Sequence, residues 1–410
     1  MLGLNSEERS GASIVAGTAI GASMLSLPFI SGVGGFIPAC LIMVTCYLFA
    51  IITLLLFLEV TFYCSDTDAN IISMAHMHLG KAGEVITWFC FLFLLYIIST
   101  SYISGGAELL ESIVTPYWEI DTYICMIIFT VIFGLVAFQG VALLDKINQV
   151  LLLALLLSYA GLIIVIGPET KISYLSGGKP IYLISSIPIT IAAFASHFVV
   201  PSLRKNFSAN LTSIKKMLWI GSTIPLAVYL VYQYLIVALL PFDGPDGLFA
   251  IAKSASPLSA LQKTLASDGA TTIPLLMNVF SNCAILTSFL GVVLALSDFL
   301  EDGLGLAKYK NPQLICALLT LGPPLLISII VPKESSGFLL ALDLSGLLVT
   351  FLFGILPVIM VWKARYVEKL SSVYTIPGGK VVLVVIFAVS LFVIFGVFAN
   401  TFGYLPSPRG

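Results

Sequence analysis

Helix-breaking residues interrupt an otherwise apolar segment near the start of the chain. Residues 17–28 read Gly-Thr-Ala-Ile-Gly-Ala-Ser-Met-Leu-Ser-Leu-Pro, with Gly17 and Gly21 four positions apart. Glycine costs about 1 kcal/mol in a helix interior and proline removes a backbone hydrogen bond, so this is a weak helix midpoint. Unwinding would free N–H groups for a carboxylate and carbonyl groups for an ammonium. One kink could therefore hold both charged ends of a small zwitterion.

A second interrupted segment lies five predicted spans later. Pro188 and Pro201 bracket a run of small residues with His197, the one histidine inside a predicted span. An ionisable side chain at membrane depth is a candidate for function, and a neutral histidine bonded to a neighbouring helix is the alternative. Gly17 and Gly21 alone would also suit close helix packing. Breaks at corresponding places in two halves favour the broken-helix arrangement of secondary transporters.

The amino-acid composition indicates what kind of secondary structure and environment must position these residues. Of 410 residues, 59% are hydrophobic and 10% are charged, and the mean hydropathy is +1.07. Soluble domains carry about 25% charged residues, and disordered chains are less hydrophobic still. The net charge of −2 leaves no basic surface for nucleic acid. The chain is predicted to be a polytopic protein embedded in a lipid bilayer.

Long apolar runs predict about eleven transmembrane helices, since a span needs about 20 apolar residues. The runs fall at residues 11–36, 38–60, 85–107, 121–138, 148–167, 185–203, 214–240, 272–300, 313–331, 337–362 and 381–404. Because they are continuously apolar, helices are favoured over a barrel. Residues 62–82 are predicted to be a cytoplasmic connection with a short amphipathic piece, and residues 241–271 the longest loop.

The predicted fold is an all-α polytopic membrane protein with one transmembrane domain, residues 1–410. A first repeat covers about 11–167, a second about 185–362, and an extra helix about 381–404. Most of the 19 lysines and arginines fall in alternate connections, which places the N-terminus inside and the C-terminus outside. The sequence carries no signal for an oligomeric state.

The sequence contains no motif for nucleotide binding, metal binding or hydrolysis. No Gly-Lys pair completes a phosphate-binding loop, and His76 and His78 form no His-Glu-x-x-His. Cys-x-x-Cys and Gly-x-Ser-x-Gly are also absent, so no metal, cofactor or enzyme activity is predicted. A carrier and a channel remain, and eleven spans in one chain favour the carrier.

Several segments resemble the hydroxy and aromatic amino acid permease family over essentially the whole chain. The segment from Gly17 to Pro28 looks like its Gly-Thr-x-Ile-Gly-Ala-Gly-Met-Leu-x-x-Pro opening, with serine at position 23 in place of glycine. Residues 102–106 resemble the motif that ends its third span, residues 194–205 its sixth-span ending, and residues 219–226 its seventh-span opening. Among the branches of this family, the sequence looks most like the bacterial tyrosine-specific transporters.

The resemblance implies proton symport of an aromatic amino acid, most simply L-tyrosine, into the cell across the bacterial cytoplasmic (inner) membrane. It also implies the fold of leucine-transporter-type carriers, a 5+5 inverted repeat plus one helix, working by alternating access. Tryptophan or a broader range of aromatic and hydroxy amino acids is the alternative substrate. A sodium-coupled carrier and a passive channel or facilitator for a small polar solute are the alternative mechanisms.

Site roles follow as hypotheses. Backbone groups of the first break are expected to bind the carboxylate and part of the ammonium: Gly17, Thr18, Ile20, Gly21 and Ala22. Carbonyls near Phe194, Ala195 and Ser196 would complete the ammonium site. The substrate ring would lie against Phe194 and Tyr102, while Asn278 and Asn282 could reach its hydroxyl group.

The coupling ion is expected to be a proton, with His197 as its candidate carrier because imidazole titrates near neutral pH. Carbonyls of the first span with Thr287 or Ser288 would form the competing sodium site. Seven acidic residues lie at span ends and are interpreted as facing water: Glu59, Glu108, Glu111, Asp298, Glu301, Asp302 and Asp343.

Overall fold

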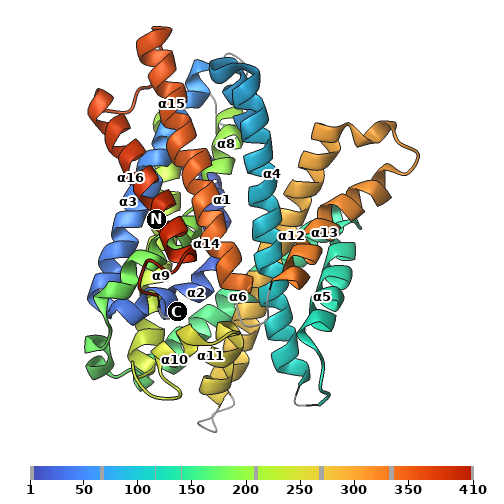
Figure 1. Cartoon of the computed structure of the whole chain (residues 1–410), viewed down its shortest axis with the longest axis vertical. Helices are drawn as coiled ribbons and strands as arrows, with labels where there is room; N and C mark the ends of the chain where they lie inside the picture. Colours follow the sequence, from blue (N-terminus) through green and yellow to red (C-terminus); the bar gives the residue numbers. More distant parts are fainter. Residues whose placement is uncertain are drawn as a thin grey trace.

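The structure is a computed structural model that describes residues 4–64, 69–115, 117–139, 141–206, 211–266, 272–331 and 337–407. Within these residues every regular element is a helix (Figure 1). Nine helices there are long and apolar enough to cross a membrane, one bent pair crosses as a unit, and one shorter apolar helix accompanies them. Together they correspond to the eleven predicted spans.

The first five spans are formed by six helices. They are α1 (Ser6–Ala19), α2 (Ser23–Ile30), α3 (Phe36–Tyr63), α4 (Ile71–Val114), α5 (Thr122–Ala137) and α6 (Val141–Ile166). The apolar runs of α3 to α6 fold as helices because lipid offers their backbone groups no other partners. The first span is divided between α1 and α2.

The remaining six spans are also helical, and the first of them is again interrupted. Their helices are α7 (Ile187–Ala193), α8 (Val200–Asn206), α9 (Leu211–Leu239), α12 (Thr272–Leu304), α13 (Pro312–Ile330), α14 (Gly337–Thr350), α15 (Leu356–Trp362) and α16 (Gly379–Thr401). The sixth span combines a 3₁₀ segment, Pro180–Ser186, with α7, a second 3₁₀ turn, His197–Val199, and α8. A π-helical segment, Phe351–Ile355, joins α14 to α15, and another, Lys363–Val367, follows α15.

Both predicted interruptions are present. The first span bends by 56° between Ser6–Ala19 and Ser23–Gly34. The helical hydrogen bonds stop at residues 20–22, so Gly21 lies at the break whereas Gly17 lies inside α1. In the sixth span, residues 194–196 separate α7 from the following 3₁₀ turn. Both predicted breaks are therefore present, and the first lies at residues 20–22, within the predicted segment 17–28.

The helices form two groups that meet at these breaks. The broken spans pack with α3, α9 and α14, because α1 and α3 both lie along α9 and α7 lies along α14. In the second group α12 packs on α6 and α4, and α5 and α13 lie at the edge of the molecule beyond α12 (Figure 1). Residues of both groups therefore reach the centre of the fold.

Two predicted connections are more ordered than expected. Within residues 62–82, α4 already begins at Ile71 and bends at Gly80, whose φ of 72° suits glycine. The loop at 241–271 contains α10 (Leu248–Lys253) and α11 (Pro257–Ala266), and residues 267–271 lie outside the described chain. α11 packs against α2, α4 and α12, so this loop covers one end of the broken first span.

The interpretation of the acidic residues as water-facing is wrong for three of them. Glu59 is 0% exposed, and Glu108 and Asp343 are each 5% exposed. Glu59 is buried because Arg365 binds it: the Arg365 Nε lies 2.6 Å from its Oε1, and a second guanidinium nitrogen contacts Oε2. The Tyr63 hydroxyl and the Ile376 amide donate to the same carboxylate at 2.9 and 2.8 Å. This network joins α3 to the segment after α15.

Candidate functional site

The two interrupted spans meet at the hydroxyl group of Tyr229 on α9. This hydroxyl lies 2.6 Å from the carbonyl oxygen of Ala19, the last residue of α1, and 2.8 Å from that of Ala193, the last residue of α7. A phenol carries one hydrogen, so the two carbonyls share one donor. Because both carbonyls end helices, their partial negative charges converge here. The arrangement suits a group with several N–H donors, such as an ammonium ion.

Aromatic rings lie beside this point. The ring of Phe194, directly after α7, has its centroid 5.1 Å from the Tyr229 ring and 6.0 Å from the Tyr47 ring. Tyr47 comes from α3, and its hydroxyl is 2.8 Å from the Thr223 hydroxyl on α9, which fixes the ring. Aromatic side chains favour such tilted and edge contacts, and a further ring can join them.

Ser288 on α12 links the first break to the second helix group. Its Oγ accepts a hydrogen bond from the Ala22 N–H at 3.2 Å, and the buried Tyr102 of α4 also interacts with its side chain. A Cβ atom on Gly21 would lie 2.5 Å from the same Oγ. Glycine at position 21 therefore allows α12 to approach the backbone of the break. The N-terminus of α2, next to it, has no side-chain cap.

His197 is buried next to the second break. Its Nε2 is 2.9 Å from Thr53 Oγ1, and its ring stacks on Phe353 of the π-helical segment with centroids 4.7 Å apart. The Thr53 hydroxyl already has backbone carbonyls of its own helix as acceptors at 2.9 and 3.0 Å. It therefore accepts from Nε2–H, and the buried Nδ1 is left as an acceptor without a partner. The neighbouring Ser196 Oγ also has none.

The structure brings together only part of the predicted site. Gly21, Ala22 and Phe194 lie in the breaks and contact the residues described above, and Ile20, Ala195 and Ser196 belong to the same segments. Gly17 is exposed, with nothing within 4 Å of an added Cβ, and the Thr18 hydroxyl donates to a carbonyl of its own helix at 2.8 Å.

The two asparagines lie nearer the N-terminus of α12 than Ser288 does. Asn282 precedes Ser288 by six residues, and its amide nitrogen donates to the carbonyl oxygen of Asn278 at 2.8 Å. Asn278 is half-buried, and its side-chain oxygen has no partner. Ser288 forms a hydrogen bond with the backbone of the first break. The hydrogen bonds described for the two asparagines do not connect them to either break. The expected contact with a substrate hydroxyl stays a prediction.

Sequence reasoning missed three residues of this region: Tyr229, Tyr47 and Thr53. Each of the three forms a hydrogen bond with a residue more than 100 positions away. Tyr229 forms a second one with Ala193, which is 36 positions away. None belongs to a short motif. The sequence did offer one signal for the tyrosines: each places a polar hydroxyl group in the middle of a predicted span. His197 was selected because it is a polar side chain within a span, and the same criterion would have selected Tyr229 and Tyr47.

The two sides of the first break differ in exposure. All residues of α2 from Met24 to Ile30 are buried, under neighbours that include α7, α9, α10 and α11. On α1, by contrast, Ser13, Ile14 and Gly17 are exposed along one face that leads to the break. The first break is therefore covered on the α2 side, whereas α1 has an exposed face.

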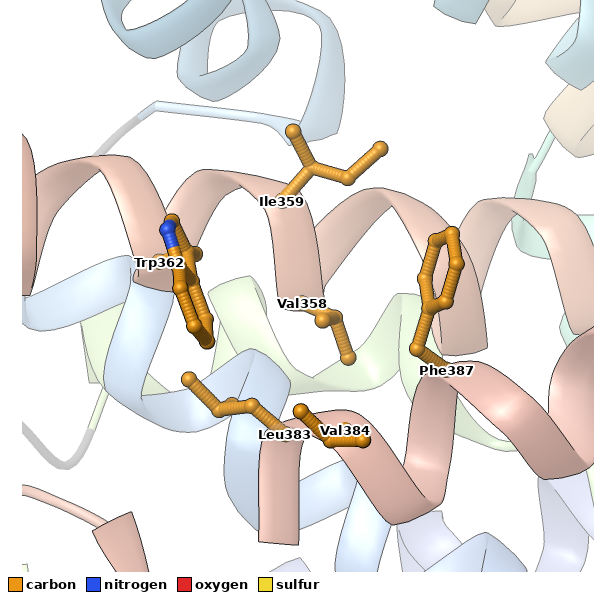
Figure 2. A pocket seen from close by; sticks show the side chains of 6 residues that line it. All are labelled: Val358, Ile359, Trp362, Leu383, Val384 and Phe387. Carbon is orange, nitrogen blue, oxygen red and sulfur yellow. The ribbon is translucent and has the colours of Figure 1, made fainter. Parts of the chain in front are cut away.

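A groove of about 250 Å³ elsewhere is unlike this site. It lies between α15 and α16 and is lined by Val358, Ile359, Trp362, Leu383, Val384 and Phe387 (Figure 2). Its lining offers aliphatic and aromatic carbon and no charged group, which suits lipid chains and not a zwitterion. Among the residues that the structure describes, no cluster of three or more His, Cys, Asp or Glu side chains could hold a metal.

Comparison with known proteins gives relatives over nearly the full length. Tyrosine-specific transport system 1 of Haemophilus influenzae is 32% identical, over 96% of this chain and 97% of that protein. The tryptophan-specific transport protein of Pseudomonas aeruginosa is 29% identical, over 93% of this chain and 92% of that protein. These relatives are transporters, in agreement with the prediction that the chain is not an enzyme.

The fold is also similar to solved structures. A manganese transporter of Eremococcus coleocola superposes with a TM-score of 0.62 at 13% identity, covering 98% of this chain and 89% of that one. At this identity the likeness concerns the fold alone, and it confirms the predicted all-helical, multi-spanning fold. Residues 6–397 match the profile of one family. The chain therefore belongs to the tryptophan/tyrosine permease family and is a multi-spanning protein of the bacterial inner membrane.

Proposed function

We propose that this protein imports an aromatic amino acid, tyrosine foremost, by proton symport with alternating access. The observation that carries the proposal is the convergence of two helix C-termini on one hydroxyl group, beside the ring of Phe194. Relatives named as tyrosine-specific and tryptophan-specific transporters support the substrate class. Tryptophan is the nearest alternative substrate.

Each part of an amino acid has a counterpart in this region. The substrate ammonium would take the carbonyls of Ala19 and Ala193, and thereby replace the shared donor of Tyr229. The carboxylate would bind at the uncapped N-terminus of α2, whose dipole favours an anion. The substrate ring would lie against Phe194, with Tyr102 near the first break.

The difference in exposure across the first break supports alternating access. With the predicted orientation, the exposed face of α1 is the cytoplasmic approach, and α2 lies on the outer side beneath α11. In the proposed cycle, this arrangement is assigned to the inward-facing state. Import would require an opposite state in which α2 and α11 separate and α1 closes.

His197 remains the sequence's candidate for the coupling proton. Its Nδ1 can accept a proton, but none of the acidic residues that the structure describes pairs with it, and an unpaired buried cation is costly. Sodium bound near Thr287 and Ser288 is the competing idea. There the Thr287 hydroxyl donates to the Cys283 carbonyl at 2.8 Å, and Ser288 binds Ala22 N–H.

The direct test is uptake of labelled tyrosine, tryptophan, phenylalanine and serine by a transport-deficient bacterium that expresses the chain. We expect saturable tyrosine uptake, competition by unlabelled tyrosine, and accumulation above the outside concentration. A channel would equilibrate its solute without accumulating it. In vesicles, an imposed pH gradient without sodium should drive uptake, and a strict requirement for sodium would contradict proton symport.

Gly21 and Gly17, treated alike from sequence, should differ on substitution. Gly21→Ala places a Cβ 2.5 Å from Ser288 Oγ, and rotating that hydroxyl away would leave the Ala22 N–H without its acceptor. We expect tyrosine uptake to fall by roughly tenfold, the equivalent of about 1.4 kcal/mol. Gly17→Ala meets open space and should remain close to the parent.

Initial uptake rates, normalised to protein in the membrane, provide the measurement. Ser288→Ala removes the same acceptor of the Ala22 N–H without adding an atom at position 21, so it should lose a similar part of the rate. Equal losses in Gly17→Ala and Gly21→Ala would show that contact with α12 is not the reason for glycine at the break.

A further inference from the structure

A buried carboxyl group lies on α4, outside the region of the two breaks. Glu108 is 5% exposed, and its Oε2 atom has no hydrogen-bond partner. It lines a cavity of about 50 Å³ with Ser104 of the same helix, Thr122 and Tyr123 of α5, and Ser256 just before α11. This space admits a water molecule or a small cation and excludes an amino acid. The carboxyl group is therefore separate from the substrate site.

No positive side chain balances this carboxyl among the described residues that line the cavity. Glu111, one turn further along α4, is itself acidic and accepts from the Thr122 hydroxyl at 2.7 Å. Asp121 caps the N-terminus of α5 and adds a second negative group nearby. The one other titratable group in the lining is the Tyr123 phenol. Helix α4 and its neighbour α5 thus oppose a negative charge on Glu108.

The other helices packed on α4 supply no positive group there. Lys263 of α11 is exposed, α13 carries no charged residue along its length, and Asp343 of α14 is buried and acidic. On α12 the first charged residue is Asp298, toward its other end. Among the described residues, an ionised Glu108 would thus have the Leu258 backbone amide as a hydrogen-bond donor but no cationic side chain to balance its buried charge.

Glu108 also touches the segment that covers the first broken span. The backbone amide of Leu258, in the first turn of α11, interacts with its carboxyl group. Since α11 packs on α2 as well as on α4, its closed position completes both the cover over α2 and the cavity around Glu108. Moving α11 away would open the two together.

We propose that Glu108 is the site of the coupling proton, and that α11 closes over the outer side when this carboxyl is protonated. The inference deepens the proposed function and depends on it. With α11 open, the carboxylate takes a proton from outer water and forms an O–H bond. After closure this O–H supplies a donor in a cavity where two buried oxygens, Glu108 Oε2 and Ser104 Oγ, have no partner.

The proton has a polar course inward along α4. Ser104 lies one turn before Glu108, and Ser101 one turn before Ser104, so they share one helix face. Next to Ser101, Tyr102 interacts with Ser288, which binds the backbone of the first break. These side chains connect the level of the cavity with the level of the substrate site. Release toward the cytoplasm, as the carboxylate re-forms, completes one proton moved per cycle.

The test uses the full chain in vesicles prepared in potassium buffer without sodium. Uptake of labelled tyrosine is measured at several external pH values with the internal pH fixed. For one coupled proton, the limiting accumulation of the parent protein should change about tenfold per unit of pH difference. Glu108→Gln should show no accumulation and no dependence on external pH. Its exchange of labelled for unlabelled tyrosine should stay within about threefold of the parent, because the neutral amide mimics the protonated acid.

Glu111→Gln is the matched control, since this residue lies one turn away and is bonded to Thr122, and it should keep the pH dependence. A pH profile of Glu108→Gln like that of the parent would overturn the inference. If Glu108→Gln loses exchange as well, Glu108→Asp decides: restored pH-driven accumulation supports a proton site, and failure indicates a structural role. A sodium gradient that drives the parent at equal pH would overturn the proton assignment. A parent that takes up no aromatic amino acid contradicts the proposed function itself.

Discussion

Tyr229→Phe should lower the initial rate of tyrosine uptake by roughly tenfold or more while the protein remains in the membrane. The hydroxyl is the shared donor for the carbonyl groups of Ala19 and Ala193. Without it, two buried helix ends lose their partner, and a buried polar group left unsatisfied costs about 1–3 kcal/mol. The ends would move apart or take up water, and the substrate ammonium would meet a less organised site. The rate is measured with labelled tyrosine and normalised to the membrane-inserted protein.

Tyr232→Phe provides a matched comparison on the same helix. Tyr232 is 1% exposed, its ring lies 5.5 Å from that of Phe280, and its hydroxyl has no hydrogen-bond partner. Removing that hydroxyl breaks no bond, so uptake should remain close to the parent. If Tyr229→Phe behaves like Tyr232→Phe, the bridge between the two breaks does not organise the site.

Glu59→Gln should destabilise the folded protein by about 3–5 kcal/mol, the range for removing one partner of a buried ion pair. The substitution leaves the Arg365 guanidinium without its counter-charge, although Tyr63 and the Ile376 amide keep an oxygen acceptor nearby. A lower melting temperature of the purified protein in detergent would be the direct readout. The effect should be on stability first, since the network lies away from the two breaks.

Two further variants test whether the unpaired charge of Arg365 causes the loss of stability. Glu84→Gln removes a carboxyl group that pairs with the exposed Lys81 at 2.9 Å, and it should leave the melting temperature close to that of the parent. Glu59→Gln/Arg365→Gln removes both charges, so it should be more stable than Glu59→Gln alone. An equal loss in the double variant would mean that the buried charge of Arg365 is not the cause.

The breaks could be predicted from the sequence because their causes are local. Gly21, Pro188 and Pro201 act on the backbone of their own segments, and a reader of the sequence sees them in an apolar context. The exact position of a break is harder to predict than its existence. Gly17 lies inside α1, whereas the first break falls at residues 20–22. A helix can carry one exposed glycine without breaking there.

The partners of these breaks could not be predicted in the same way. Tyr229 is 210 positions from Ala19, and Ser288 is 266 positions from Ala22, so packing of distant helices decides both contacts. Glu59 and Glu108 show a different difficulty. Hydropathy assigns an acidic residue to the end of a span, but burial depends on whether another segment, such as that of Arg365 or α11, covers it.

The π-helical segment Phe351–Ile355 fixes the rotational phase of everything that follows it. A π turn contains one residue more than an α turn, and one residue corresponds to about 100° around a helix axis. Deleting a single residue there would restore a regular helix and would turn Arg365 away from Glu59 by about a quarter of a revolution. The length of this segment is thus constrained as strictly as its composition. A relative that lacks one residue here must neutralise the buried carboxylate from another position.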